Sequence, residues 1–243
     1  ILCGILQHPQ RVPRPAWNDG RRHGYSRYRS TITMAAYDKG RPKFKRDSIR
    51  ESLVGQFLDL EFYPNYFENS RRITEKNLQL SGVDVKSNFI GDDEEILIDE
   101  KAATSWAYRE ISTFALELSF LMNGEEIEGW FFPRKGKTLT THWLFIWPRT
   151  SGGDINSVED IISAEIMLMK TRDLRRWIRR MASKSDTSIE ECISLLRKSD
   201  SEKEINWCGL RIIISRQLPE QPINILIPKE ILMAVNKGRY WKI

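Results

Sequence analysis

The hydrophobic positions from residue 47 onward follow two periods, one helical and one typical of strands. Residues 47–62 carry a helical repeat of apolar side chains, at Ile49, Leu53, Phe57 and Leu60. This spacing predicts an amphipathic helix. In residues 112–120, STFALELSF, phenylalanine or leucine occupies every second position, which predicts a strand with one buried face.

Residues 82–90 and 94–101 are two further predicted strands, joined by a turn at Gly91-Asp92. Glycine in the first central position of a two-residue turn favours type II′. In the hairpin that results, Asp84 lies directly opposite Asp99, with their Cβ atoms about 5 Å apart. The opposite face of the hairpin carries valines and isoleucines, which can pack on a core.

The remaining apolar patterns predict strands and helices to the end of the chain. Strands are expected at 128–132, 141–147, 210–215 and 223–227, and helices at 170–182 and 188–198. Residues 164–169, AEIMLM, fit either a strand or the start of the next helix. This mixture predicts an α/β chain of the α+β type with a mixed sheet.

Composition separates the first 33 residues from the rest. Residues 1–33 are rich in Arg, Pro, Gly and Ser and show no structural period, which predicts a disordered basic segment. They are either translated upstream sequence ahead of Met34 or a basic arm that touches nucleic acid. Residues 34–243 are long enough for one domain with its own core.

The few cysteines and histidines limit the available chemistry. Three widely separated cysteines without a CxxC pair argue against a disulfide framework and against a zinc site. Three histidines, none near another in sequence, give little basis for a metal cluster or a Ser-His-Asp triad. Catalysis would therefore depend on carboxylates, lysines and hydroxyls.

The net charge and the lengths of the apolar runs limit the expected cellular location and binding partners of the protein. The net charge is +5 and the pI is about 9.1, a modest basic excess that favours phosphate polyanions without requiring them. No apolar run is long enough to span a membrane. The apolar start ILCGILQHPQ lacks the basic cluster of a signal peptide, so a cytoplasmic protein without membrane contact is expected.

The hairpin places unusual chemistry on its polar face, where Asp84 and Asp99 meet and Lys101 points the same way. Like charges opposite one another on a sheet are destabilising unless water, a proton or a cation separates them. Carboxylate oxygens are ligands for Mg²⁺, and a lysine beside them can orient a water molecule or stabilise developing charge. The pattern indicates a metal site for phosphate esters.

Asp84 followed by IDEKA, which contains Asp99-x-Lys101, resembles the PD-(D/E)xK nuclease superfamily, the restriction endonuclease-like fold. The resemblance covers residues 47–182, and Val83 stands where that family often has proline. It implies a core of helix, strand hairpin, strand, helix and strand, followed here by a C-terminal α/β extension. It also implies Mg²⁺, or Mn²⁺ in its place, bound by Asp84, Asp99 and the backbone carbonyl of Glu100.

Two further carboxylates are candidates for the same catalytic site. Glu117 lies inside an apolar strand, where a carboxylate needs a partner or a cavity, and the family often has a third acid near this place. Glu51 resembles the glutamate that the family's first helix contributes. Ser48-Ile49-Arg50-Glu51 is also a capping-box pattern, and the capping interpretation is slightly favoured.

The helix predicted at 170–182 is rich in arginine around an apolar stripe. Its arginines are Arg172, Arg175, Arg176, Arg179 and Arg180. They are candidates for binding a nucleic-acid backbone, because cations that neutralise phosphates release counterions. A solvated face whose arginine stems cover their neighbours explains the pattern equally well.

The expected function is that of a Mg²⁺-dependent endonuclease that hydrolyses phosphodiester bonds of DNA, in a restriction, phage or repair context. RNA stays open as a substrate, and so does a homodimer. The first alternative is a catalytically inactive nuclease-fold protein that binds nucleic acid, alone or as a subunit of a larger assembly. The second is an unrelated α/β interaction protein whose hairpin is incidental.

Overall fold

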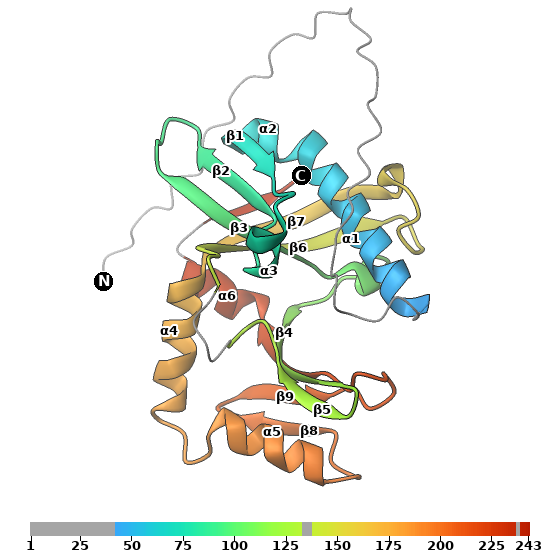
Figure 1. Cartoon of the computed structure of the whole chain (residues 1–243), viewed down its shortest axis with the longest axis vertical. Coiled ribbons are helices and arrows are strands. Elements are labelled where there is room, and N and C mark those ends of the chain that lie inside the picture. The colour runs from blue at the N-terminus through green and yellow to red at the C-terminus, as the bar shows by residue number, and fades with distance from the viewer. Residues whose placement is uncertain (1–41, 133–137, 237–238) are drawn as a thin grey trace, which may run out of the picture. The chain divides into compact units, whose positions relative to one another are not determined.

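The structure is a computed structural model that describes residues 42–132, 138–236 and 239–243. The segment 1–33 and the start expected at Met34 lie outside the described residues. Strands and helices are mixed along the chain (Figure 1), which confirms the expected α+β class. Among the described residues, no helix is long and apolar enough to cross a membrane.

The first sheet has six strands and contains the predicted hairpin. In spatial order they are β1 (Phe67–Arg72), β2 (Val85–Phe89), β3 (Glu95–Ala102), β6 (His142–Thr150), β7 (Ile161–Lys170) and β11 (Tyr240–Lys242). The β3–β6 pair is parallel and the other pairs are antiparallel, so the sheet is mixed, as expected.

The second sheet has five antiparallel strands. In spatial order they are β5 (Glu125–Glu128), β4 (Thr113–Met122), β10 (Ile223–Pro228), β9 (Leu210–Ile214) and β8 (Glu204–Trp207). The strand expected third in a nuclease-like core is β4, and it belongs to this second sheet. The neighbour of β3 in the first sheet is β6 instead.

The helices lie before, between and after these strands. They are α1 (Pro42–Glu61), α2 (Tyr63–Tyr66), α3 (Lys76–Leu80), α4 (Thr171–Ala182), α5 (Ile189–Lys198) and α6 (Lys229–Asn236). Two 3₁₀ turns, η1 (Thr104–Trp106) and η2 (Val158–Asp160), complete the described elements.

Strand β6 is buried on both faces and divides two hydrophobic cores. Leu144 and Ile146 pack in a cluster with apolar residues of α1. Phe145 and Trp147 point the other way, into a cluster formed with the second sheet, α4 and α5. Side chains alternate along a strand, so β6, an almost continuous apolar run, can fill both cores.

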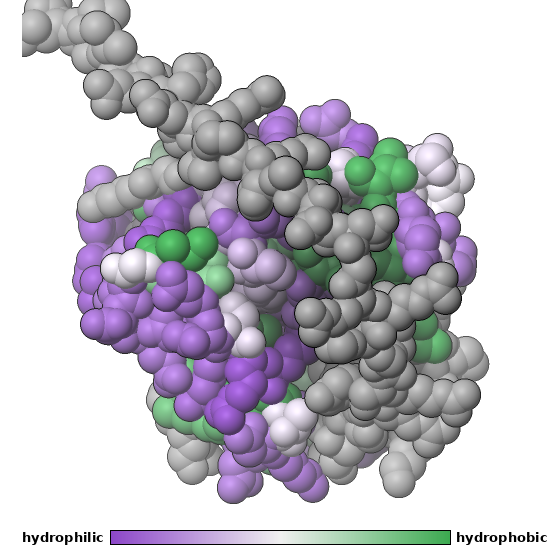
Figure 2. All heavy atoms as spheres, turned by 90° about the horizontal axis from the view of Figure 1, so that it is seen from above, coloured by the Kyte–Doolittle hydropathy of each residue, from purple (hydrophilic) through white to green (hydrophobic). Residues whose placement is uncertain are grey.

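Several local expectations are corrected by the structure. Ile49 and Leu60 are each 60% exposed, because α1 turns Val54 and Leu58 into the core beside Phe57, the buried member of the predicted stripe. Single exposed hydrophobic residues of this kind are ordinary. One face of the molecule shows them scattered among hydrophilic residues (Figure 2).

The turn between β2 and β3 also differs from its prediction. The Asp92 amide donates to the Phe89 carbonyl (2.9 Å), so Ile90 and Gly91 are the central residues of the turn. Gly91 has φ +78°, as the third position of a type II turn requires. A longer connection follows before β3, and the predicted two-residue type II′ turn is wrong.

Two further segments are settled by their surroundings. Residues 164–169 lie within strand β7 rather than in a helix, because they pair with β6 along its length. The predicted strand at 128–132 is wrong, since β5 ends at Glu128 and a turn follows.

Candidate active site

The β2–β3 hairpin positions Asp84 against the strand that carries the predicted catalytic residues. Val85 pairs with Ile98, which confirms the expected register. Asp84 directly precedes β2. Its amide donates to the Ile98 carbonyl (2.8 Å), and its side-chain Oδ2 accepts a hydrogen bond from the Glu100 amide (2.8 Å). The carboxylate of Asp84 is thus held by the main chain of β3.

Asp99 and Lys101 lie together on the same side of β3. The Lys101 Nζ donates to Asp99 Oδ1 (2.5 Å). The Asp99 side chain is 7% exposed and that of Lys101 is 25% exposed. The ammonium also lies 5.0 Å from the ring centroid of Trp130, within the range of a cation–π contact. The lysine is therefore fixed at the border between the protein interior and water.

The two aspartates disfavour each other's ionised form. Burial, and next the negative charge of Asp99, raise the pKa of Asp84 to about 7, against the lowering effect of Lys101. Burial also raises the pKa of Asp99, although the lysine it contacts opposes this. A side-chain hydrogen bond joins the two carboxyl groups. Near neutral pH the Asp84 carboxyl is therefore protonated in a substantial fraction of the molecules.

Glu51 lies within electrostatic range of the same group. The predicted capping box is wrong, because α1 begins at Pro42 and Ser48 is an interior helical residue. Glu51 is exposed, yet desolvation by surrounding protein atoms raises its pKa, while Lys101 lowers it and Asp84 raises it. The first helix therefore brings this carboxylate within electrostatic range of Lys101 and Asp84.

Glu117 reaches the site from the second sheet. Burial raises the pKa of this carboxyl, whereas the positive charge of Lys101 lowers it. The segment after β5 runs close to the same place, since the Phe131 amide donates to the Glu117 carbonyl (3.2 Å). A Cβ on Gly129 would lie 2.2 Å from that carbonyl oxygen. Glycine is thus required for the approach that places Trp130 beside Lys101.

The main chain and the side chain of Glu100 point to different parts of the structure. Its amide faces Asp84, and in a strand the carbonyl of a residue points the same way as its amide. The carbonyl therefore points to the side where β2 has ended, consistent with the predicted ligand position. The side chain points to the opposite face of the sheet and binds Arg72.

The five arginines of α4 do not behave alike. Arg175 is half-buried: its Nε donates to the Phe131 carbonyl (3.1 Å) and its guanidinium lies 4.9 Å from the Trp143 ring centroid. Desolvation and Arg179 lower its pKa, and the charge of Asp99 opposes this. The other four, Arg172, Arg176, Arg179 and Arg180, are exposed, and Arg176 pairs with Asp173 (3.3 Å).

The donor atoms of the site fit a hard divalent cation. The Asp84 and Asp99 carboxylates, with a main-chain carbonyl on the same side, offer the oxygen ligands that Mg²⁺ prefers. In the part of the chain that the structure describes, no group of three or more His, Cys, Asp or Glu side chains could hold a metal ion. Asp84 and Asp99 would thus need water, the Glu100 carbonyl or phosphate oxygens as further ligands.

Sequence reasoning missed Arg72, Trp130 and Gly129. Arg72 is 28 residues from Glu100 and Trp130 is 29 residues from Lys101, so local patterns carry no signal for these contacts. Gly129, placed between Glu128 and Trp130, could have suggested a close backbone approach.

Comparison with known proteins yields no relative: no protein-family model matches the chain, and no curated protein or solved structure is significantly similar to it.

Proposed function

We propose that the chain is a metal-dependent nuclease that hydrolyses phosphodiester bonds of DNA, with a nuclease-like core around β2 and β3. One observation carries the proposal: Lys101 lies among four carboxylates that come from α1, the hairpin and the second sheet. They are Asp84, Asp99, Glu51 and Glu117. Acids concentrated around one lysine, with raised pKa values, are typical of active sites.

Each residue has a role that follows from its place. Asp84 and Asp99, with the Glu100 carbonyl, would hold Mg²⁺ or Mn²⁺. When bound, the metal would offset phosphate charge and lower the pKa of a bound water. Glu51 and Glu117 complete the ring of negative charge around Lys101.

Lys101 acts as a cation and hydrogen-bond donor rather than as a base. The negative charges of Asp99, Asp84 and Glu51 raise its pKa despite burial, so it stays protonated at neutral pH. An ammonium group can orient the attacking water and stabilise the charge that develops on phosphate oxygens.

Proton transfer then falls to a carboxylate. As the water oxygen bonds to phosphorus and the ester P–O bond breaks, the water must lose a proton and the leaving oxygen must gain one. Glu51 is exposed and its pKa is raised, which suits it to accept the proton from water. A second water molecule can supply the proton to the leaving oxygen.

The exposed arginines of α4 suit the proposed substrate. Arg172, Arg179 and Arg180 are accessible and can neutralise phosphates of a nucleic-acid backbone. Their replacement should weaken binding in a salt-dependent way.

The test is cleavage of plasmid, single-stranded DNA and RNA with Mg²⁺ or Mn²⁺. Wild type should cut, whereas Asp99→Ala and Lys101→Ala should not. Lys86→Ala is the matched control, because Asp84-Val85-Lys86 repeats the same triplet while Lys86 pairs with Glu95 (3.4 Å).

Three results would speak against the proposal. Equal cleavage by all variants would exclude the assigned roles. A wild type that binds DNA without cutting it in either metal would favour the inactive nuclease-fold protein. Absence of both metal and DNA binding would favour the unrelated interaction protein.

A further inference from the structure

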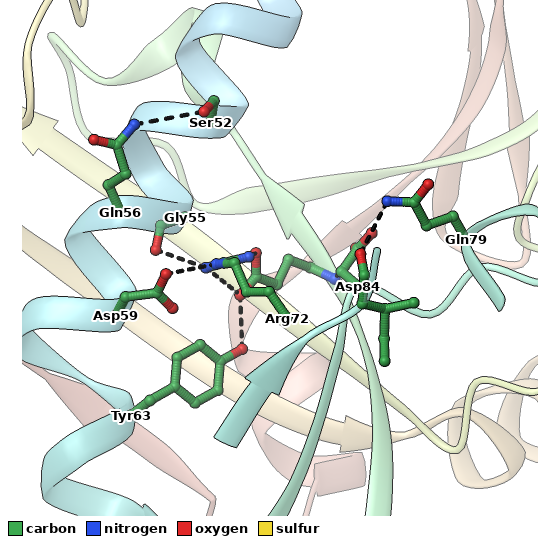
Figure 3. Close-up of polar contacts among 10 residues, drawn as sticks. Ser52, Gly55, Gln56, Asp59, Tyr63, Arg72, Gln79 and Asp84 are labelled. Carbon is green, nitrogen blue, oxygen red and sulfur yellow. Dashed lines mark hydrogen bonds and ion pairs between the residues drawn. The ribbon is translucent and has the colours of Figure 1, made fainter. Parts of the chain in front are cut away.

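The face of β3 opposite the site carries a dense polar network around Arg72 (Figure 3). The guanidinium of Arg72 makes a two-pronged contact with Glu100, through Nη1 to Oε2 (2.9 Å) and Nη2 to Oε1 (3.2 Å). Its Nε donates to Asp59 Oδ2 (2.6 Å) and its Nη2 also donates to the Gly55 carbonyl (2.6 Å). The hydroxyl of Tyr63 donates to Glu100 Oε1 (2.7 Å). Every nitrogen of the guanidinium is engaged.

Helix α1 is shaped to receive this guanidinium. Gly55 lies where the helix passes over Arg72, and a Cβ there would meet Arg72 Nη2 at 2.9 Å. The side chain of Glu100 is 12% exposed and that of Arg72 is 33% exposed. A two-pronged arginine–carboxylate pair fixes geometry as well as charge. The network therefore defines where Glu100 stands relative to α1 and β1.

Main-chain hydrogen bonds connect this network to Asp84. The Ile73 amide, next to Arg72, donates to the Asp84 carbonyl (2.8 Å). The Glu100 amide donates to the Asp84 side chain (2.8 Å). The Arg72–Glu100 pair thus joins the two segments that hold Asp84, one by its carbonyl and one by its carboxylate.

We propose that Arg72 is a positioning residue: its ion pair with Glu100 fixes the Glu100 amide, which in turn holds the Asp84 carboxylate in the site. The effect on cleavage rests on the proposed nuclease function, whereas the effect on the Glu100 amide does not. Arg72 points away from Lys101 and Asp99, so it acts without touching a substrate.

The test is amide hydrogen exchange of the metal-free protein, followed by NMR. The quantity measured is the protection of the Glu100 amide divided by that of the Ala103 amide, which donates to the Ile146 carbonyl (2.9 Å) in the same region of the sheet. A general loss of stability lowers both protections, so the ratio reports local release alone. Arg72→Lys should lower the ratio about tenfold, because an ammonium cannot form the two-pronged contact.

Two more variants make the test independent of charge and of folding. Gly55→Ala displaces the guanidinium from the helix side and should also lower the ratio. Gly55→Ala also serves if Arg72→Lys does not fold. Tyr63→Phe removes one hydroxyl from Glu100 but keeps the Arg72 pair, so it should lower the ratio less than Arg72→Lys does. Arg71→Lys is the control, since Arg71 is exposed and 3.7 Å from Glu75, and it should leave the ratio unchanged.

Binding and cleavage then separate the two proposals. Arg72→Lys should weaken Mn²⁺ binding in calorimetry about tenfold and lower kcat for DNA while leaving KM unchanged. An unchanged exchange ratio in Arg72→Lys, or in Gly55→Ala where Arg72→Lys does not fold, would overturn the positioning role, even if wild type cuts DNA. A lowered ratio in a protein that neither binds Mn²⁺ nor cuts DNA would keep the positioning role and reject the nuclease.

Discussion

Two neighbouring acids on β3 meet opposite surroundings. The Glu100 carboxylate is matched by the guanidinium of Arg72 and by a tyrosine hydroxyl, so its charge is neutralised by permanent partners. Asp99 faces Lys101 and also Asp84, a second acid whose pKa is raised to about 7 by burial and by Asp99 itself. On that side a single cation, Lys101, compensates the charge of several carboxylates.

The difference shows how one strand can combine rigidity with reactivity. Side chains alternate between the faces of a sheet, so consecutive acids are separated by the sheet itself. The Glu100 face carries the ion pair with Arg72. On the Asp99 face the carboxylates outnumber the one nearby cation, Lys101. In the proposed nuclease, a metal ion would replace a proton on the Asp99 face while the ion pair on the Glu100 face stays in place.

The largest effect should come from making the same chemical change on the two faces. Glu100→Gln removes the charge that matches Arg72, and it should lower the free energy of unfolding by about 2–3 kcal/mol. Asp99→Asn should change it by less than about 1 kcal/mol, because Asp84 can ionise and replace Asp99 as the partner of Lys101. Urea unfolding at pH 7 without metal measures both. Equal losses would show that the two faces are equivalent.

The next largest effect on stability should come from Gly129, which precedes Trp130 beside Lys101. Gly129→Ala places a Cβ against the Glu117 carbonyl, where only 2.2 Å is available, and should cost about 2 kcal/mol through backbone displacement. Trp130 should then move away from Lys101, which a change in tryptophan fluorescence would detect.

Gly153→Ala is the matched control for that change. A Cβ on Gly153 meets nothing within 4 Å, so its stability should stay within about 0.5 kcal/mol of wild type. If the two alanine variants unfold at the same urea concentration, the close approach at Gly129 has no energetic consequence.

The hairpin was predictable because its signals are local. A two-residue period and a glycine near the turn set the pairing of Val85 with Ile98, although the turn type was wrong. The approach of Asp84 to Asp99 and Lys101 followed from that pairing alone.

Other parts depend on contacts that no local pattern encodes. The serine–glutamate spacing at Ser48 imitates a helix start, but the helix begins earlier, so Glu51 was free for the site. The position of Glu117 depends on how the second sheet packs. Arg72 binds Glu100, which lies 28 residues away in the sequence. Sequence reasoning could name carboxylates for the site but not the framework that holds them.

The raised pKa of Asp84 predicts a pH dependence. The ordinary pKa of Asp84 is 3.8 and its folded value is about 7, so the folded state binds more protons between these values. The contribution of Asp84 to stability should therefore fall as pH rises from about 4 to about 7. Asp84→Asn should reduce this fall by about 1–2 kcal/mol, measured by urea unfolding across the range with a metal chelator present. An unchanged slope would mean that Asp84 ionises normally.

His142 provides the opposite slope and the smallest effect. His142 is 4% exposed, and its Nε2 is buried without a hydrogen-bond partner among the described residues. Burial first, and then Lys170, Arg239 and Arg172, lower its pKa from 6.5 to about 4, against the weaker influence of Asp173.

Between those two values His142 is protonated in the unfolded chain and neutral in the folded protein, so the contribution of His142 to stability should fall as pH decreases from about 6.5 to about 4. His142→Phe keeps an aromatic ring and removes the titration. At pH 7.5 it should match wild type within about 1 kcal/mol, and at pH 4.5 it should be more stable relative to wild type by on the order of 1 kcal/mol. In Asp84→Asn, where the opposing slope is reduced, the contribution of His142 should become visible directly as a steeper loss of stability toward acid. The double variant with His142→Phe should remove that loss, and a loss that persists would assign it to another group.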